Sequence, residues 1–161
     1  MAEGAIIRKA TRKDAPAIHE MVVALARSTG KIGLVSSSAE DIARDGFGER
    51  PAFEALIAMD GVKAVGLALY FPEYSTWRGR RGVYLQDLYV SDKARSAGLG
   101  QRLVEALAAE AAQEGATYLR LAVDAANARA ADFYERLGFA ESREDRMFML
   151  KDGAFNALVK T

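Results

Sequence analysis

Apolar residues along the first thirty positions change from the spacing of a strand to that of a helix. Residues 6–9 predict a short strand that begins with two isoleucines. Thr11 is followed three residues later by Asp14, a pattern typical of a capping box at a helix start. Apolar side chains then recur at helical spacing until Gly30, which is typical of a helix end. The chain therefore begins with a predicted strand and a predicted helix.

A second helix and an antiparallel hairpin are predicted next. Ser38, with an aspartate three residues later, favours the start of a short helix that ends near Gly46, after a loop over residues 31–37. Residues 53–59 and 62–70 are apolar and strand-like, and the Asp-Gly dipeptide at 60–61 between them is a strong hairpin signal.

The second half of the chain alternates strands with helices after a predicted loop over residues 72–82. The expected elements are a strand at 83–90, a helix from 99 to about 114, a strand at 118–123, a helix from about 128 to 137, and a terminal hairpin through 147–150. This order predicts an α/β fold with a mixed sheet and a parallel crossover in its middle. Ligands of such sheets bind where neighbouring strands diverge at their carboxyl ends, here between the strands beginning at 83 and 118.

A glycine-spaced loop lies at the mouth of that predicted crevice. Residues 95–100 read Arg-Ser-Ala-Gly-Leu-Gly and open the helix that connects the two strands. Unpaired backbone N–H groups and the helix dipole attract an anion there, and glycine lets the backbone approach it closely. A dinucleotide fingerprint would require glycine at Leu103, and no Gly-Lys-Ser or Gly-Lys-Thr run is present, so neither of those nucleotide sites is predicted.

Composition excludes several functions. The 161 residues are 50% apolar and predict one domain over residues 1–161. Lys plus Arg and Asp plus Glu number 22 each, so no net charge favours nucleic acid as a partner. The chain has no cysteine and a single histidine, His19, which argues against disulfides and metal binding. No apolar run reaches the ~20 residues of a membrane helix, and we expect a soluble cytoplasmic protein.

Two motifs of the second half resemble those of a known family. Residues 95–100 match the Arg/Gln-x-x-Gly-x-Gly/Ala loop that binds the acyl-CoA pyrophosphate in the GNAT acetyltransferase superfamily. Asn127, followed by Phe133-Tyr134 and residues 137–139, resembles the second motif of that superfamily. The resemblance implies a GNAT-like fold, in which a central mixed sheet with splayed strands is flanked by about four to five helices.

Further segments resemble one branch of this superfamily, the diamine (spermidine/spermine or thialysine) N-acetyltransferases. They are residues 45–49, residues 74–77 and residues 84–87, and the likeness as a whole covers residues 6 to 150. The resemblance implies an enzyme that transfers acetyl from acetyl-CoA to the primary amine of a small molecule, without a metal. It also implies a homodimer whose acceptor pocket draws on both subunits.

The family pattern assigns the cofactor contacts to backbone groups. N–H groups of the strand hold the acetyl carbonyl and the pantetheine arm, at Leu88, Tyr89 and Val90. The loop and helix start hold the pyrophosphate, at Arg95, Ser96, Ala97, Gly98, Leu99, Gly100 and Gln101. Asn127 would orient the cofactor arm, and Tyr134 would donate its proton to the leaving thiolate.

The general base is less certain because Gln86 occupies the position at which the polyamine branch typically has a glutamate. An amide cannot accept a proton at neutral pH, and an alkylammonium of pKa ~10.4 is only about one part in a few thousand neutral at pH 7. Asp87, Glu54 and Glu73 are alternative bases. Strand alternation predicts that Asp87 lies on the opposite face from Gln86, which weakens it as a direct replacement.

The predicted acceptor site differs from that of polyamine enzymes. Residues 28–33 lack the aromatic and acidic residues of that branch, and the segment 77–81 carries three arginines. Asp87, Trp77 and Glu54 are the predicted substrate-binding residues. An amine that also bears a carboxylate, such as a lysine-like or thialysine-like amino acid, fits this charge at least as well as a polyamine. The alternative function is a CoA-binding sensor or partner-binding module, catalytically weakened by Gln86.

Overall fold

The computed structural model describes residues 4–159, which fall into two compact units. Unit 1 runs to Ala122 and contains a five-stranded sheet with three α-helices, and unit 2 begins at Val123 and contains two short α-helices. Within the described residues, no helix is long and apolar enough to cross a membrane.

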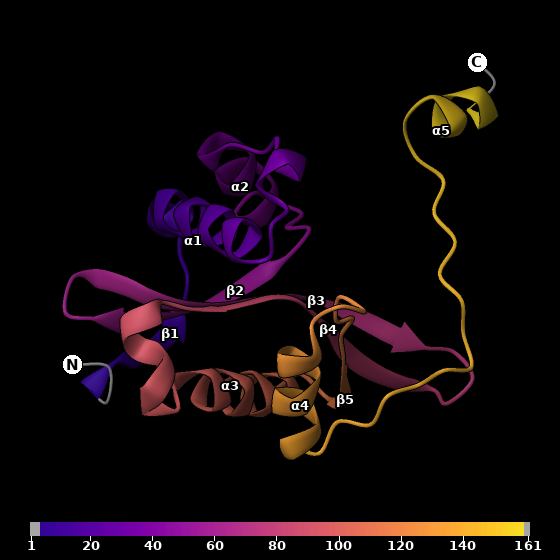
Figure 1. The fold of residues 1–161 in the computed structure, drawn as a ribbon. Helices are drawn as coiled ribbons and strands as arrows, with labels where there is room; N and C mark the ends of the chain where they lie inside the picture. The colour runs from indigo at the N-terminus through magenta and orange to yellow at the C-terminus, as the bar shows by residue number, and fades with distance from the viewer. Residues whose placement is uncertain (1–3, 160–161) are drawn as a thin grey trace. The chain divides into compact units, whose positions relative to one another are not determined.

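The sheet of unit 1 is mixed, as predicted. Its strands follow one another in space in the order of the chain, namely β1 (Ile6–Lys9), β2 (Glu54–Asp60), β3 (Lys63–Ser75), β4 (Arg80–Val90) and β5 (Ala116–Arg120). The first three pairings are antiparallel and only β4 and β5 run parallel (Figure 1). A parallel pair needs a crossover connection, and α3 (Leu99–Gln113) supplies it.

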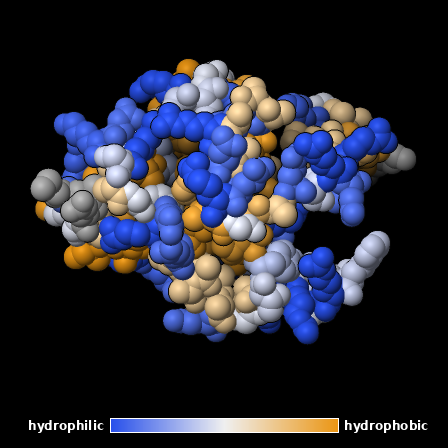
Figure 2. Space-filling view, turned by 60° about the horizontal axis from the view of Figure 1, so that its bottom comes forward, coloured by the Kyte–Doolittle hydropathy of each residue, from blue (hydrophilic) through white to orange (hydrophobic). Residues whose placement is uncertain are grey.

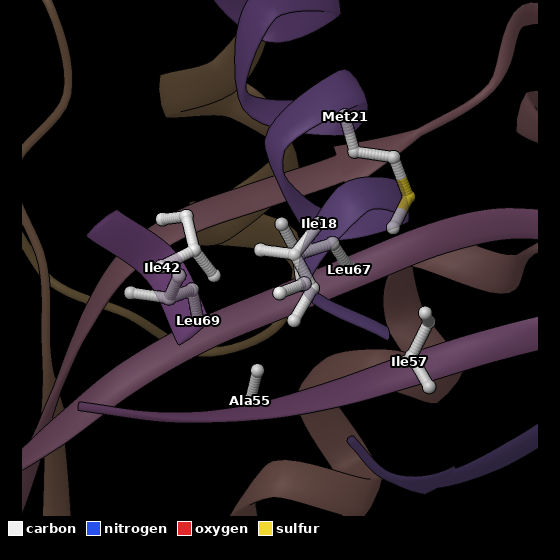
Figure 3. Packing of buried hydrophobic residues seen from close by; sticks show 8 residues of the cluster. Ile18, Met21, Ile42, Ala55, Ile57, Leu67 and Leu69 are labelled. Atoms are coloured by element: carbon white, nitrogen blue, oxygen red, sulfur yellow. The ribbon is translucent and has the colours of Figure 1, made fainter. Parts of the chain in front are cut away.

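Helices cover both faces of this sheet. Figure 1 shows α1 (Ala15–Ser28) and α2 (Ala39–Gly46) on one face and α3 on the other. Beneath α1 and α2, the apolar stripe of each helix packs on alternate residues of β2 and β3 (Figure 3). The side chains of this core cluster are Ala15, Ile18, Met21, Ile42, Ala55, Ile57, Leu67 and Leu69.

Two local signals in the sequence explain where α2 begins and where the chain turns from β2 into β3. The Ser38 hydroxyl accepts a hydrogen bond from the Asp41 N–H, and the Asp41 carboxylate accepts one from the Ser38 N–H, so the predicted capping box is confirmed. At the β2–β3 turn, Gly61 has φ of 62°, a left-handed conformation that glycine adopts without strain. The predicted hairpin is therefore confirmed as well.

The predicted loop over residues 72–82 is wrong. β3 continues to Ser75 and β4 begins at Arg80, so the connection shrinks to residues 76–79. The pattern misled because Pro72 cannot donate to a ladder hydrogen bond. Pro72 is tolerated because the last β2 partner of β3 is Tyr70, and beyond that point β3 pairs only with β4.

Unit 2 differs from the prediction at its carboxyl end. It contains α4 (Ala128–Arg136), close to the expected helix, and α5 (Asp152–Leu158), which the sequence pattern did not predict. The terminal hairpin expected through residues 147–150 is wrong, because residues 140–150 carry no regular secondary structure. A strand is stabilised by ladder hydrogen bonds to a neighbouring strand. The described residues of unit 2 contain no strand that could supply them. The strand expected at 118–123 is shifted to β5, which ends at Arg120.

Candidate active site

The parallel strands β4 and β5 separate at the carboxyl end of the sheet. Their last pair joins Tyr84 to Arg120, where β5 ends, whereas β4 continues to Val90 paired only with β3. From Leu85 to Val90, the edge of β4 that faces away from β3 has no strand neighbour within residues 4–122. The backbone of Leu88, Tyr89 and Val90 lies in this open segment, and their predicted contacts with the cofactor stay predictions.

A β-bulge lies in β4 immediately after the point of separation. Leu85 pairs with Tyr70 of β3 and Asp87 pairs with Leu69, so Gln86 is an extra residue without a partner. Leu69 belongs to the core cluster beneath α1, and paired residues share a face of the sheet. Asp87 therefore lies on the α1 face. Gln86 has no partner in the ladder, so its predicted position on the opposite face from Asp87 stays a prediction.

The environment of Asp87 changes the pKa of its carboxylate. Desolvation raises the pKa of Asp87 above its ordinary value, while the neighbouring Gln86 side chain is exposed. Within residues 4–122 no hydrogen bond or ion pair satisfies the Asp87 carboxylate. A half-buried carboxylate without a hydrogen-bond partner, beside a strand edge without a strand neighbour, is a candidate proton acceptor.

A polar and aromatic cluster fixes the last pair before the strands separate. Arg120 Nε and Nη2 lie 2.8 and 2.9 Å from the two carboxylate oxygens of Glu73, a bidentate arrangement. The Arg120 guanidinium also lies over the Tyr84 ring, 5.0 Å from its centroid, and Tyr84 stacks on Phe71 at 5.1 Å. Hydrogen bonding to Arg120 lowers the pKa of Glu73. The Glu73 carboxylate is therefore engaged in a structural contact, which argues against its predicted alternative role as a base.

The connection from β4 to α3 forms a turn suited to an anion. Residues 92–97 form the 3₁₀ helix η4, and Gly98 adopts φ of 70° before α3 begins at Leu99. The first N–H groups of α3 have no carbonyl partner within their own helix, and the positive end of its dipole lies here. Arg95 is held at this turn by a hydrogen bond to the Val90 carbonyl and an ion pair with Asp92. The predicted segment from Ser96 to Gln101 thus surrounds this helix start.

Two predicted residues belong to unit 2 and are described there. Asn127 caps α4, since its side-chain oxygen accepts a hydrogen bond from the Ala130 N–H at 3.1 Å. The half-buried Tyr134 ring makes edge-to-face contacts with Phe133 at 5.1 Å and Phe139 at 5.4 Å. Their predicted roles toward the cofactor stay predictions.

Two predicted substrate residues do not lie beside the bulge. Trp77 is 100% exposed in the short β3–β4 turn. Glu54 pairs with Tyr70, the residue after Leu69, so it lies on the opposite face of the sheet from Asp87. Of the predicted catalytic and substrate-binding residues in unit 1, the structure brings together Gln86 and Asp87 alone. Sequence reasoning missed Arg120, because its partners Glu73 and Tyr84 come from two other strands and lie far from it in the sequence.

Fold and site together define an acyltransferase of the GNAT type, and comparison with known proteins agrees. The chain belongs to the acetyltransferase (GNAT) family, whose model matches residues 18–139. It is 36% identical over 147 residues to the thialysine N-epsilon-acetyltransferase of Bos taurus, a match that covers 86% of each chain. It is also 29% identical over 102 residues to the L-ornithine N5-acetyltransferase of Arabidopsis thaliana, covering 63% of this chain and 45% of that protein.

Solved structures support the fold. An integron cassette protein from the mobile metagenome of V. cholerae superimposes with a TM-score of 0.82 at 22% identity, covering 98% of both chains. Among the residues that the structure describes, no group of three or more His, Cys, Asp or Glu side chains is placed to hold a metal ion.

Proposed function

We propose that this protein is an acetyl-CoA-dependent N-acetyltransferase that acts on the primary amine of a small molecule. The observation that carries the proposal is the separation of β4 from β5 beside the Gly98 turn, with the Gln86–Asp87 bulge at its inner end. An open strand edge offers hydrogen bonds to the pantetheine amides, and the start of α3 offers N–H groups to the pyrophosphate. Both features follow from the backbone alone.

We assign the proton acceptor to Asp87. The acceptor amine must lose a proton before or during attack on the thioester, and an amide at position 86 cannot take it. Burial raises the pKa of Asp87, so its carboxylate is a stronger base than that of an ordinary aspartate. Gln86 then orients the amine or an intervening water through its exposed amide.

The remaining roles follow the family pattern. Backbone N–H groups of Leu88 to Val90 bind the acetyl oxygen and stabilise the negative charge that develops on it. Tyr134 donates its proton to the leaving thiolate, and Asn127 orients the cofactor arm with the amide nitrogen that its capping bond leaves free for this purpose. Both residues belong to unit 2, so we propose that the two units act as one acetyltransferase domain.

The acceptor is proposed to carry a carboxylate as well as an amine. The thialysine and L-ornithine acetyltransferases among the relatives act, by their names, on amino acids. Arg78, in the turn between β3 and β4, and Arg80, the first residue of β4, are both exposed. We also propose a homodimer and a cytoplasmic location; an absence of cysteine is compatible with a reducing compartment.

A thiol-release assay tests the proposed function. Purified protein is mixed with acetyl-CoA and a panel of thialysine, lysine, ornithine, spermidine and short diamines, and free CoA is followed. We expect turnover that is highest with an amino-acid acceptor and falls at least ~100-fold in Tyr134→Phe, the variant that lacks the proton donor. Absence of turnover with every amine in the panel would contradict the proposal.

Exposed Gln86 favours a second candidate, a CoA-binding sensor without catalysis. The same assay separates the two when it is paired with calorimetry of CoA binding. Binding of CoA without turnover would support the sensor. The Gln86→Glu variant adds a control, because a gain of polyamine acetylation would mean that the base had been lost from this chain.

A further inference from the structure

A cavity of about 490 Å³ opens on the α3 side of unit 1. It lies beside the last turns of α3, at the opposite end of that helix from the Gly98 turn, and is not used by the proposed acetyl transfer. Its wall includes the carboxylates of Glu54, Glu110 and Glu114. Figure 2, in which the bottom of Figure 1 comes forward, shows hydrophilic residues next to hydrophobic ones on the face drawn.

The floor of the cavity contains an unsatisfied hydroxyl. Tyr70 is 3% exposed, lines the cavity, and has no hydrogen-bond partner for its hydroxyl among the described residues. Burial, and then the charges of the wall residues Glu54, Glu110 and Glu114, raise the pKa of Tyr70. The neutral hydroxyl retains both a donor and acceptor lone pairs, and a buried polar group without a partner requires an explanation.

The protein already places one ammonium among these carboxylates. Lys9 Nζ lies 2.9 Å from Glu110 Oε1 and 3.7 Å from Glu54 Oε1. The Glu114 carboxylate interacts with Lys9 through its charge but forms no hydrogen bond or ion pair within residues 4–122. The wall also carries Arg81 and a fourth glutamate, Glu73, which is paired with Arg120. The other three carboxylates face two cations, which leaves the cavity one positive charge short.

We propose that this cavity binds a small organic cation, an alkylammonium whose N–H groups donate to Glu114 and to the Tyr70 hydroxyl. Its hydrocarbon part lies against the apolar wall at Pro72, Val83 and Ala111. An anion would meet three carboxylates and is disfavoured. A metal ion is disfavoured too, because these glutamates are not grouped closely enough to ligate one.

The proposal is tested by calorimetry on the full chain without acetyl-CoA. The probe is N-methylbutylammonium, a secondary ammonium that keeps two N–H donors, and no acetyl transfer can occur because acetyl-CoA is absent. The wild type is expected to bind one equivalent. Glu114→Gln should weaken binding about tenfold, since a hydrogen bond to a charged group is lost. Glu105→Gln is the matched control, because it removes an exposed carboxylate from α3 outside the cavity wall.

Two further variants separate a ligand role from a structural one. Tyr70→Phe should weaken binding several-fold without lowering thermal stability, because the hydroxyl that it removes has no partner in the protein. Lys9→Met should strengthen binding, since it releases Glu110 for the probe. The proposal is overturned if the wild type shows no saturable binding at about 10 mM probe, if Glu114→Gln matches Glu105→Gln, or if neutral 1-hexanol binds as well as the cation.

Discussion

Removing the charge of Glu73 tests whether the bidentate contact with Arg120 stabilises the point where β4 and β5 separate. The Glu73→Gln variant keeps the size of the side chain but loses the carboxylate that accepts hydrogen bonds at 2.8 and 2.9 Å. Glu73 is 18% exposed and Arg120 is 62% exposed, so solvent screens the pair in part. We expect a loss of about 1 kcal/mol in the free energy of unfolding, between the values for exposed and buried charged pairs.

The assay is thermal and urea unfolding of the variant beside a matched control. A loss of this size corresponds to a decrease of about 2–4 °C in the midpoint of a chain of this length. Asp45→Asn is the control: Asp45 also accepts two hydrogen bonds from an arginine, at 3.0 and 2.8 Å, but that pair is 65% and 48% exposed on α2. The control should cost less stability than Glu73→Gln, because its carboxylate is more exposed.

The direction in which the stability difference between wild type and Glu73→Gln changes with pH can also be checked. Because the folded protein lowers the pKa of Glu73, the stabilisation by this carboxylate is complete above the ordinary glutamate pKa of about 4.3. This stabilisation is lost as the pH falls through the lower pKa that Glu73 has in the folded protein. The stability difference between wild type and Glu73→Gln should therefore shrink below about pH 4. Equal stabilities at pH 7, or a difference that grows in acid, would refute this reasoning.

Three other variants probe the proposed site and the core. Gly98→Ala should raise the KM for acetyl-CoA several-fold and Gly61→Ala should not, although both place a side chain at positive φ with nothing within 4 Å and should cost a similar ~1 kcal/mol of stability. Asp87→Asn should lower kcat/KM for the amine by ~100-fold or more and abolish the acid limb of its pH profile. The variant should also have a higher melting temperature at neutral pH, because a carboxyl group whose pKa is raised on folding destabilises the protein as pH rises. An unchanged pH profile of kcat/KM would exclude Asp87 as the base. Ile18→Ala should cost ~2–5 kcal/mol by chemical unfolding, because the side chain is 0% exposed in the core cluster, and a loss below ~1 kcal/mol would contradict that packing.

Much of unit 1 could be predicted because its signals are local. The Ser38 capping box, the Asp-Gly turn at 60–61 and the glycine turn at Gly98 each act within a few residues, and the structure forms all three. The mixed sheet then followed from the order of strands and helices.

The errors occurred where distant partners decide the structure. A bulge between Leu85 and Asp87 depends on the register against β3, which alternation within one strand cannot reveal. The extent of β3 past Pro72 likewise depends on which side of the strand has a neighbour. The bidentate contact of Arg120 joins residues 47 apart in sequence, so no local pattern indicated it.

The most direct test of the central claim is hydrogen exchange of the backbone amides with and without CoA. If the open edge of β4 and the start of α3 bind the cofactor, amides of Leu88 to Val90 and of Ser96 to Gln101 should exchange more slowly when CoA is present. Amides of β1 and β2 should change little. Unchanged exchange in both of these segments at saturating CoA would contradict the account.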